Sequence, residues 1–310
     1  MKDAGFVCGI DGGGTRTTVL CRFADGQDVR RSGFGPLNLN SIGDKAFRET
    51  LEGIIGYISG LGRCRALCLG VSGITNADVR RVAGSVLSGM PFPYRIMGDH
   101  EIAHTGALDR KEGLILISGT GSVCYGRTAD GKSAFTGGWG HLIGDQGSGY
   151  ALGRDALIAV AKVFDGYGKS TVLKDMLAGE LGLDTEEKIV SYVYSNDKSA
   201  IASLSPLVDR ACRQGDGVAS AIVEANAREL ADIVIAAAGK LGFVHCDVAL
   251  LGGLMEHPTC LKETFIRLLN DKAPGLSCAA PLHDAAEGAV MEAERLIVNL
   301  REISKKHNLL

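Results

Sequence analysis

Four short apolar runs, each ending in glycine, constrain the fold of this chain more than any other feature. They read "FVCGIDGGG", "ALCLGVSG", "LILISGTGS" and "DVALLGG". Strands that are apolar along their whole length are usually buried on both faces by helices. Helical patterns fill the gaps between the runs, at residues 44–60 and at about 217–241, where apolar residues recur every three or four positions. The sequence therefore predicts an α/β fold.

Two of these runs are alike, which indicates an internal repeat. "GIDGGGTRTTVL" and "LISGTGSVCYGR" both read as a strand, a turn of glycine, threonine or serine, and a second strand. The second copy begins near residue 113, and 310 residues exceed what one hydrophobic core usually supports. We therefore expect two domains, residues 1–111 and 112–310. The last helix, about 288–306, either closes the second domain or returns to the first.

Composition argues against several classes of partner. The net charge is −3, which gives no reason to expect a nucleic acid or an anionic membrane. No apolar run approaches the roughly 20 residues of a membrane-spanning helix, and "MKDAGFVCGID" does not read as a signal peptide. Nine scattered cysteines without a Cys-x-x-Cys motif favour free buried thiols in a reducing compartment. We expect a cytoplasmic protein.

The first glycine-rich loop has the character of a phosphate site. It lacks the Gly-Lys-Ser/Thr ending of a P-loop and the G-x-G-x-x-G spacing that opens a helix. The β-branched residues after Gly14 predict a β-hairpin instead. Its backbone N–H groups and the hydroxyls of Thr15 and Thr17 could bind phosphate, and Asp11 could hold Mg²⁺ through water. A plain glycine-rich hairpin with a capping aspartate is the alternative.

Two further glycine turns strengthen the nucleotide hypothesis. "SGTGS" at 118–122 repeats the first loop, so two facing hairpins could grip one triphosphate. "LLGG" at 250–253 precedes a helix and could pack against a nucleotide base.

The longest distinctive segment is "GGWGHLIGDQGSGYALGRDAL" at 137–157, accompanied by "GIDGGGTRT", "GPLN", "MGDHEIAHTGA", "LISGTGS", "RQGD" and "LLGG". With these motifs in this order, the chain resembles the sugar kinases of the actin/hexokinase/Hsp70 superfamily, in the branch of N-acetylglucosamine kinase and the BadF/BadG-type ATPases. The resemblance covers nearly the whole chain. It implies two actin-like (ribonuclease H-like) domains with a central cleft, ATP on the two hairpins, and sugar deeper in the cleft.

The resemblance also implies roles for single residues. The expected ATP contacts are Gly13, Gly14, Thr15, Thr17, Gly119, Thr120, Gly121, Ala202, Gly252 and Gly253, with Asp11 as the magnesium aspartate. The expected sugar contacts are Asn38, Asp99, Gly138, Trp139, Gly140 and Asp145. "GPLN" is one residue shorter than in the animal enzymes, which leaves Asn40 as a rival to Asn38.

Asp99 matches the catalytic aspartate of the family. A sugar hydroxyl needs a base within hydrogen-bond reach, and Asp99 ends the strand-like "YRIMGD", so its carboxylate would point into the cleft. The alternative for Asp99 is an N-cap of the following helix. For Trp139, the only tryptophan, the alternative is core packing of its side chain.

Residues 100–104, "HEIAH", formally match the zinc-protease signature H-E-x-x-H. The two histidines would share a helix face, but a metzincin would need glycine and histidine where Ala107 and Arg110 stand. The segment downstream becomes an apolar strand without a third acidic ligand. A surface or interdomain helix that carries two histidines is favoured over a zinc site.

The leading functional hypothesis is an ATP- and Mg²⁺-dependent kinase that phosphorylates the 6-hydroxyl of an amino sugar, first of all N-acetylglucosamine. Glucosamine, N-acetylmuramic acid and glucose stay open as substrates, and homodimers are common in the family that the chain resembles. One alternative is an ATPase that activates a radical 2-hydroxyacyl-CoA dehydratase or benzoyl-CoA reductase, with Cys124 as a candidate iron–sulfur ligand. A non-catalytic sugar sensor is the other, although no DNA-binding helix pair precedes the first strand.

Overall fold

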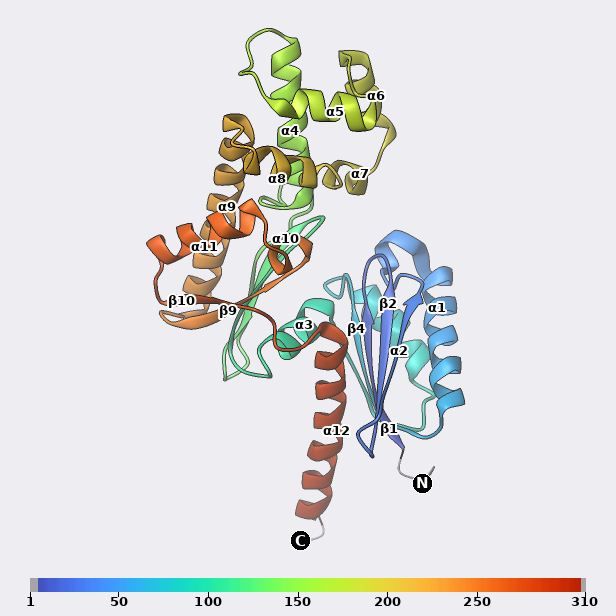
Figure 1. Cartoon of the computed structure of the whole chain (residues 1–310). Helices are drawn as coiled ribbons and strands as arrows, with labels where there is room; N and C mark the ends of the chain where they lie inside the picture. The colour runs from blue at the N-terminus through green and yellow to red at the C-terminus, as the bar shows by residue number, and fades with distance from the viewer. Residues whose placement is uncertain (1–4, 308–310) are drawn as a thin grey trace. The chain divides into compact units, whose positions relative to one another are not determined.

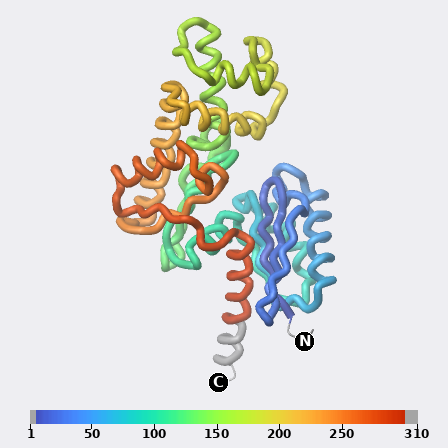
Figure 2. Tube along the Cα trace, viewed as in Figure 1, coloured from blue at the N-terminus to red at the C-terminus, as the bar shows by residue number. Residues whose placement is uncertain are grey.

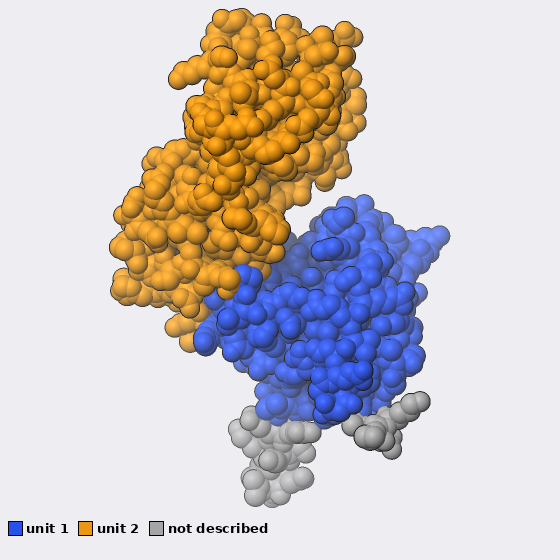
Figure 3. All heavy atoms as spheres, viewed as in Figure 1, with its two compact units in different colours: residues 1–111, 281–310 blue, residues 112–280 orange. Residues whose placement is uncertain are grey.

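The computed structural model describes residues 5–307, with side chains up to residue 299 (Figure 1). The chain divides into two compact units, coloured separately in Figure 3. Unit 1 contains the residues up to Lys111 and those from Pro281 onward, and unit 2 contains Glu112–Ala280.

The core of unit 1 is a five-stranded sheet in the order β3-β2-β1-β4-β5. The first three strands form an antiparallel meander, and β4 and β5 then continue parallel to β1. The strands are β1 Phe6–Gly12, β2 Thr17–Phe23, β3 Asp28–Phe34, β4 Cys64–Val71 and β5 Tyr94–Gly98. The hairpin predicted around Gly14 is therefore confirmed as the β1–β2 connection.

Alternate residues of the central strands face two different hydrophobic clusters. Cys8, Ile10 and Leu69 belong to a cluster shared with α1 Leu39–Leu61 and α2 Ala77–Leu87. Val7 and Cys68 face a second cluster, shared with α3 Asp99–Ala107 and α12 Ala285–His307. Burial on both faces explains why these strands are apolar without alternation.

The last helix, α12, lies directly on the first strand although most of the chain separates them (Figure 2). Gly9 makes this approach possible. A Cβ at Gly9 would lie 2.5 Å from the backbone nitrogen of Val290, which is too close for any side chain. Helix α12 also contacts β4 and α3, so it is part of unit 1.

Unit 2 repeats the sheet of unit 1. Its strands have the order β10-β9-β6-β7-β8, again with an antiparallel meander followed by two strands parallel to the first. They are β6 Gly113–Ser118, β7 Ser122–Arg127, β8 Ser133–Gly137, β9 Cys246–Leu251 and β10 Leu276–Ala279. The internal repeat and the second hairpin, β6–β7, are confirmed.

The helices of unit 2 share one hydrophobic cluster with its sheet. They are α4 Gly149–Phe164, α5 Val172–Leu181, α6 Glu186–Ser195, α7 Lys198–Ala202, α8 Ser205–Arg213, α9 Gly217–Leu241, α10 Gly253–Glu256 and α11 Cys260–Lys272. Helix α9 has the limits that its periodicity predicted. It begins after Asp216, whose carboxylate accepts from the backbone of Val218 and Ala219, and ends at Gly242 in a left-handed conformation.

The expected free cysteines are confirmed, since all nine are free thiols. Five are buried and four are partly buried. Among the described residues, no helix combines the length and the apolar character that crossing a membrane requires.

Candidate active site

The first glycine loop connects β1 to β2 and offers exposed backbone donors. The Gly13 N–H donates to the Arg16 carbonyl at 3.1 Å, which closes the turn. Gly14 and Thr15 are exposed, and their N–H groups have no hydrogen-bond acceptor among the described residues. Such a turn can accept an anion without breaking bonds of its own.

Thr17 differs from the prediction. Its side chain is buried, and its hydroxyl donates to the Gly35 carbonyl at 2.7 Å. The hydroxyl is thus already used, and it fixes the segment that leads to Asn38 rather than facing outward from the loop. Thr17 lies in β2 rather than in the turn, so it points to the interior by the alternation of the strand.

Three carboxylates interact around the end of β1. Burial and, to a smaller extent, the negative charges of Asp99 and Asp284 together raise the pKa of Asp11 to about 6, against the opposing effect of Arg16 and Arg30. A cation near Asp11 would relieve this repulsion. Because Mg²⁺ in phosphoryl-transfer sites is usually held by one or two carboxylates, phosphates and water, the donor set fits it.

Asp99 is the first residue of α3, immediately after β5. The N-cap position is Gly98, and its N–H donates to Glu101 at 2.6 Å, so Asp99 is not the cap. One Asp99 carboxylate oxygen accepts from the His100 N–H at 2.8 Å. The side chain remains 38% exposed, which leaves the carboxylate accessible to a ligand.

The two asparagine candidates have different neighbours. Asn38 is the N-cap of α1 and accepts from the Asn40 N–H at 3.1 Å. Its amide nitrogen lies 3.8 Å from where a Cβ of Gly14 would be, so Asn38 is next to the first loop. Asn40 is exposed, and its side-chain carbonyl accepts from Asn76 at 2.8 Å.

The second glycine loop, between β6 and β7, is built like the first. The Gly119 N–H donates to the Gly121 carbonyl at 2.9 Å, and the Gly119 carbonyl accepts from Gly149 at 2.7 Å. The N–H groups of Thr120 and Gly121 have no acceptor within the described part of the chain. This loop therefore also presents two adjacent donors.

Unit 2 brings the predicted nucleoside residues close to this loop. A Cβ at Gly149 would lie 3.1 Å from the Ala202 carbonyl and 3.2 Å from the Gly119 carbonyl. Gly252 has φ +90°, and a Cβ there would lie 2.4 Å from the Ser118 carbonyl. Gly253 follows as the first residue of α10, as the sequence predicted.

The predicted sugar loop also borders the second glycine loop. The Gly138 N–H donates to the Ser122 carbonyl at 3.0 Å, and the Gly140 carbonyl accepts from Gly144 at 2.8 Å. Trp139 is 74% exposed, so core packing is the wrong interpretation of this side chain. Asp145 is instead buried, and its carboxylate accepts from the Ser122 N–H at 3.2 Å.

Sequence reasoning missed two charged residues of these sites. Lys198 lies with its ammonium 3.3 Å from the Asp145 carboxylate, and Asp284 acts on Asp11 and is paired with Arg30. Neither lies in a recognisable motif. Lys198 is 53 positions after Asp145, and Asp284 is separated from Asp11 in the sequence by the whole of unit 2.

The "HEIAH" stretch does not form a metal centre. Glu101 is used at the start of α3, and His104 is fully buried. Among the residues that the structure describes, no three His, Cys, Asp or Glu side chains are arranged to hold a metal. The stretch does form a helix, but most of α3 is buried within unit 1, so the expected surface or interdomain helix is wrong in its exposure.

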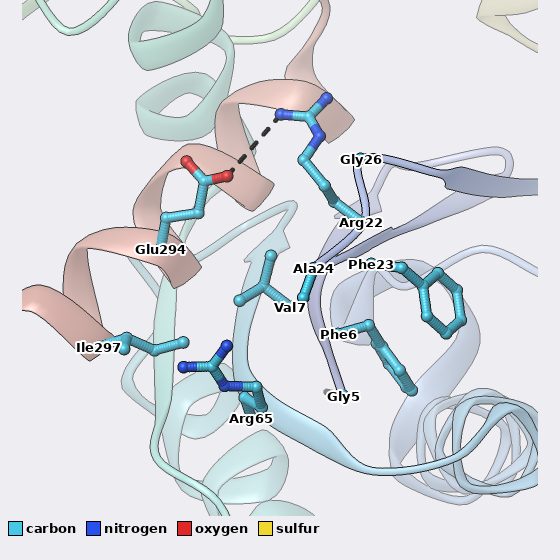
Figure 4. A pocket seen from close by; sticks show the side chains of 10 residues that line it. All are labelled: Gly5, Phe6, Val7, Arg22, Phe23, Ala24, Gly26, Arg65, Glu294 and Ile297. Carbon is cyan, nitrogen blue, oxygen red and sulfur yellow. Dashed lines mark ion pairs between the residues drawn. The ribbon is translucent and has the colours of Figure 1, made fainter. Parts of the chain in front are cut away.

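A cavity of about 340 Å³ lies elsewhere in unit 1, between the start of β1, the β2–β3 turn and α12 (Figure 4). Arg22 and Glu294 face each other at its edge with 3.9 Å between charged atoms. None of the candidate site residues lines this cavity.

The sequence profile of the BadF/BadG/BcrA/BcrD ATPase family matches residues 8–293, which is nearly the whole chain. The chain belongs to this family. Its membership implies the use of ATP, in agreement with two loops that present backbone donors.

The relatives to which the chain is similar include two kinases that act on N-acetylated amino sugars by their names. The chain is 35% identical over 301 residues to the N-acetylmuramic acid/N-acetylglucosamine kinase of Clostridium acetobutylicum, covering 93% of this chain and 98% of the relative. It is 28% identical over 307 residues to the N-acetyl-D-glucosamine kinase of Dictyostelium discoideum, covering 92% and 96%.

A solved structure from Chromobacterium violaceum has 27% sequence identity and a TM-score of 0.73, covering 93% of this chain and 98% of that one. Together with the repeated sheets, this likeness shows the actin-like α/β fold that the sequence predicted.

Proposed function

We propose that this protein is an ATP-dependent sugar kinase that transfers the γ-phosphate to the 6-hydroxyl of an amino sugar, first of all N-acetylglucosamine. The observation that carries the proposal is in unit 1. An accessible carboxylate, Asp99, acts electrostatically on a second carboxylate, Asp11, at the end of the strand that enters a glycine loop. A base, a cation site and a phosphate loop are the parts that phosphoryl transfer requires.

Each group has a role that follows from its position. Asp99 accepts the proton of the sugar hydroxyl as that oxygen attacks phosphorus. Asp11 holds water molecules of a Mg²⁺ ion, which supplies positive charge to the phosphates when it is bound. Backbone N–H groups of Gly14, Thr15, Thr120 and Gly121 are the proposed phosphate donors, since all four lack internal acceptors among the described residues.

The identity of the sugar is inferred from the relatives. Both named relatives act on N-acetylglucosamine, and the Clostridium protein also acts on N-acetylmuramic acid, by their names. Asn38 and the loop with Gly138, Trp139, Gly140 and Asp145 are the proposed sugar contacts. Asn38 is preferred over Asn40 because it adjoins the first phosphate loop, whereas Asn40 is engaged with Asn76.

The alternative of a radical-enzyme activator receives no support from the cysteines. An iron–sulfur cluster shared with a partner needs thiols that reach the surface. Cys124, the candidate ligand, is fully buried in the cluster of unit 2, and burial raises the pKa of its thiol well above the usual range.

The direct test is ATP consumption by the purified protein with N-acetylglucosamine, N-acetylmuramic acid, glucosamine and glucose, each at several Mg²⁺ concentrations. The proposal expects sugar-dependent turnover that is fastest with N-acetylglucosamine, and NMR of the product should place the phosphate on the 6-oxygen. The control is the same reaction without sugar. ATP hydrolysis that no sugar stimulates would refute the kinase assignment, and phosphate on another oxygen would correct its position.

A further inference from the structure

Lys198 lies beside the second phosphate loop and has no role in the site described so far. It is the first residue of α7, the helix that also contains Ala202. Its ammonium nitrogen is 3.3 Å from one oxygen of the Asp145 carboxylate, and the other oxygen accepts from the Ser122 N–H at 3.2 Å. The carboxylate is thus held between a cation and the start of β7.

The position of Asp145 is closely determined by its surroundings. Its side chain is only 5% exposed, and its backbone has φ +58°, a left-handed conformation that few non-glycine residues adopt. Such strain persists where several contacts fix a residue in place. A buried carboxylate is tolerated when it is paired and hydrogen-bonded, and Lys198 and Ser122 provide these partners.

The carboxylate also touches the loop itself. A Cβ on Gly121 would lie 2.9 Å from one Asp145 oxygen and 3.0 Å from the other. Any phosphate held by the N–H groups of Thr120 or Gly121 would therefore be close to a second negative charge. In a partly buried site, like charges at short range repel strongly unless a cation balances them.

We infer that Lys198 is a positioning residue for the nucleotide: by neutralising and fixing the Asp145 carboxylate, it allows the loop Gly119–Gly121 to accept phosphate. This inference rests on the proposed function, because it requires that loop to bind the nucleotide. It assigns to Lys198 an effect on ATP affinity that acts through Asp145 and is separate from any contact of Asp145 with sugar.

The test is a double-mutant cycle at Lys198 and Asp145 in which the affinity for Mg·ATP is measured directly. Affinity for Mg·ATP is measured by calorimetry, without sugar, on the full chain and on Lys198→Met, Asp145→Asn and the double variant. Lys198→Met should weaken binding by about tenfold or more, because it leaves an unbalanced buried charge beside the phosphate. Asp145→Asn should bind ATP at least as tightly as wild type. The double variant should recover most of the affinity lost in Lys198→Met.

Recovery of Mg·ATP affinity in the double variant distinguishes an electrostatic role of the pair from a purely structural one. If the pair only held the fold, removing both partners would not restore binding, so a double variant as weak as Lys198→Met would overturn the inference. Asp145→Asn binding as weakly as Lys198→Met would do the same. If Lys198→Met does not fold, the double variant decides alone: near-normal affinity supports the inference, and lost affinity overturns it.

Two controls complete the design. Lys198→Arg keeps the charge and should bind Mg·ATP nearly as wild type. Lys188→Met removes a lysine that is 54% exposed on the neighbouring α6 and pairs with Asp184, and it should leave binding unchanged. A wild type that does not bind Mg·ATP would overturn the proposed function and this inference together. Normal wild-type binding with unaltered Lys198→Met would overturn the inference alone.

Discussion

Arg95 on β5 and Glu292 on α12 form an ion pair of 2.8 Å that fastens the last helix of unit 1 to its sheet. Glu292 is 1% exposed, and its other carboxylate oxygen accepts from the Thr105 hydroxyl at 3.2 Å. The pair joins residues 197 positions apart. Helix α12 covers β1, which leads into the first phosphate loop, so the pair stabilises the strand that positions Asp11.

Removing one partner of this pair should destabilise the protein. Arg95→Met leaves the Glu292 charge buried without its main partner, and breaking a buried pair in this way typically costs about 3–5 kcal/mol. Urea unfolding of Arg95→Met should show a loss in this range. Glu294→Gln is the matched control on the same helix, because Glu294 is 39% exposed and should change stability by less than about 1 kcal/mol. Equal effects of the two variants would contradict the assignment.

Asp11→Asn should stabilise the fold above pH 6 while abolishing Mg²⁺-dependent turnover. The folded chain raises the pKa of Asp11 to about 6 from 3.8, so the native state holds this proton more tightly than the unfolded state. Ionised Asp11 therefore costs stability that grows between pH 4 and 6 and persists above. Neutral asparagine removes this cost, which is on the order of 3 kcal/mol.

The test is the sign of the difference in free energy of unfolding between Asp11→Asn and wild type. Free energies of unfolding of wild type and Asp11→Asn should differ at pH 7.5 and converge near pH 4. Asp271→Asn, at a position 70% exposed on α11, serves as the control and should show no such pH-dependent gain. Asp11→Asn less stable than wild type at pH 7.5 would contradict the burial and repulsion assigned to this carboxylate.

Thr17→Val should lower stability more than it lowers ATP affinity. Valine keeps the shape of the buried side chain but removes the hydrogen bond to the Gly35 carbonyl, at a cost of about 1 kcal/mol. Thr17→Ser retains the hydroxyl and should preserve the bond. Unfolding experiments and the KM for ATP distinguish the roles. A large rise in KM for ATP in Thr17→Val, with unchanged stability, would return Thr17 to the set of direct phosphate contacts.

The sequence predicted the four apolar strands, the two hairpins and α9 because their signals are local. The apolar runs, the β-branched residues after Gly14 and the apolar periodicity at 217–241 lie within the elements that they predict. The start of α1 was placed five residues too late, at 44 instead of 39. Gly43 has a non-helical φ of +76° that interrupts the pattern, while Asn38 already caps the preceding turn.

The site was less predictable, because its electrostatic partners come from distant segments. No local spacing joins Asp145 to Lys198 or Asp11 to Asp284, and only the folded chain brings each pair together. The direction of a side chain is equally hidden. Thr15 and Thr17 look alike in the sequence. Thr15 lies in the exposed turn, whereas Thr17 is the first residue of β2 and its hydroxyl donates to the buried side, to the Gly35 carbonyl.

Asp99→Asn should lower kcat by about 10²–10⁴ with N-acetylglucosamine, because the amide cannot accept the hydroxyl proton. The asparagine retains the size of the side chain and can still accept from the His100 N–H, so the start of α3 should be preserved. The KM for ATP should change little, since the proposed phosphate donors are backbone groups.

His100→Gln is the matched control. It removes the ring that lies 3.3 Å from Asp99 but leaves the carboxylate, and most activity should remain. Coupled turnover assays at saturating ATP, together with unfolding curves for both variants, provide the measurement. Wild-type kcat in a folded Asp99→Asn protein would remove Asp99 from the role of base, and loss of activity confined to His100→Gln would transfer that role to the histidine.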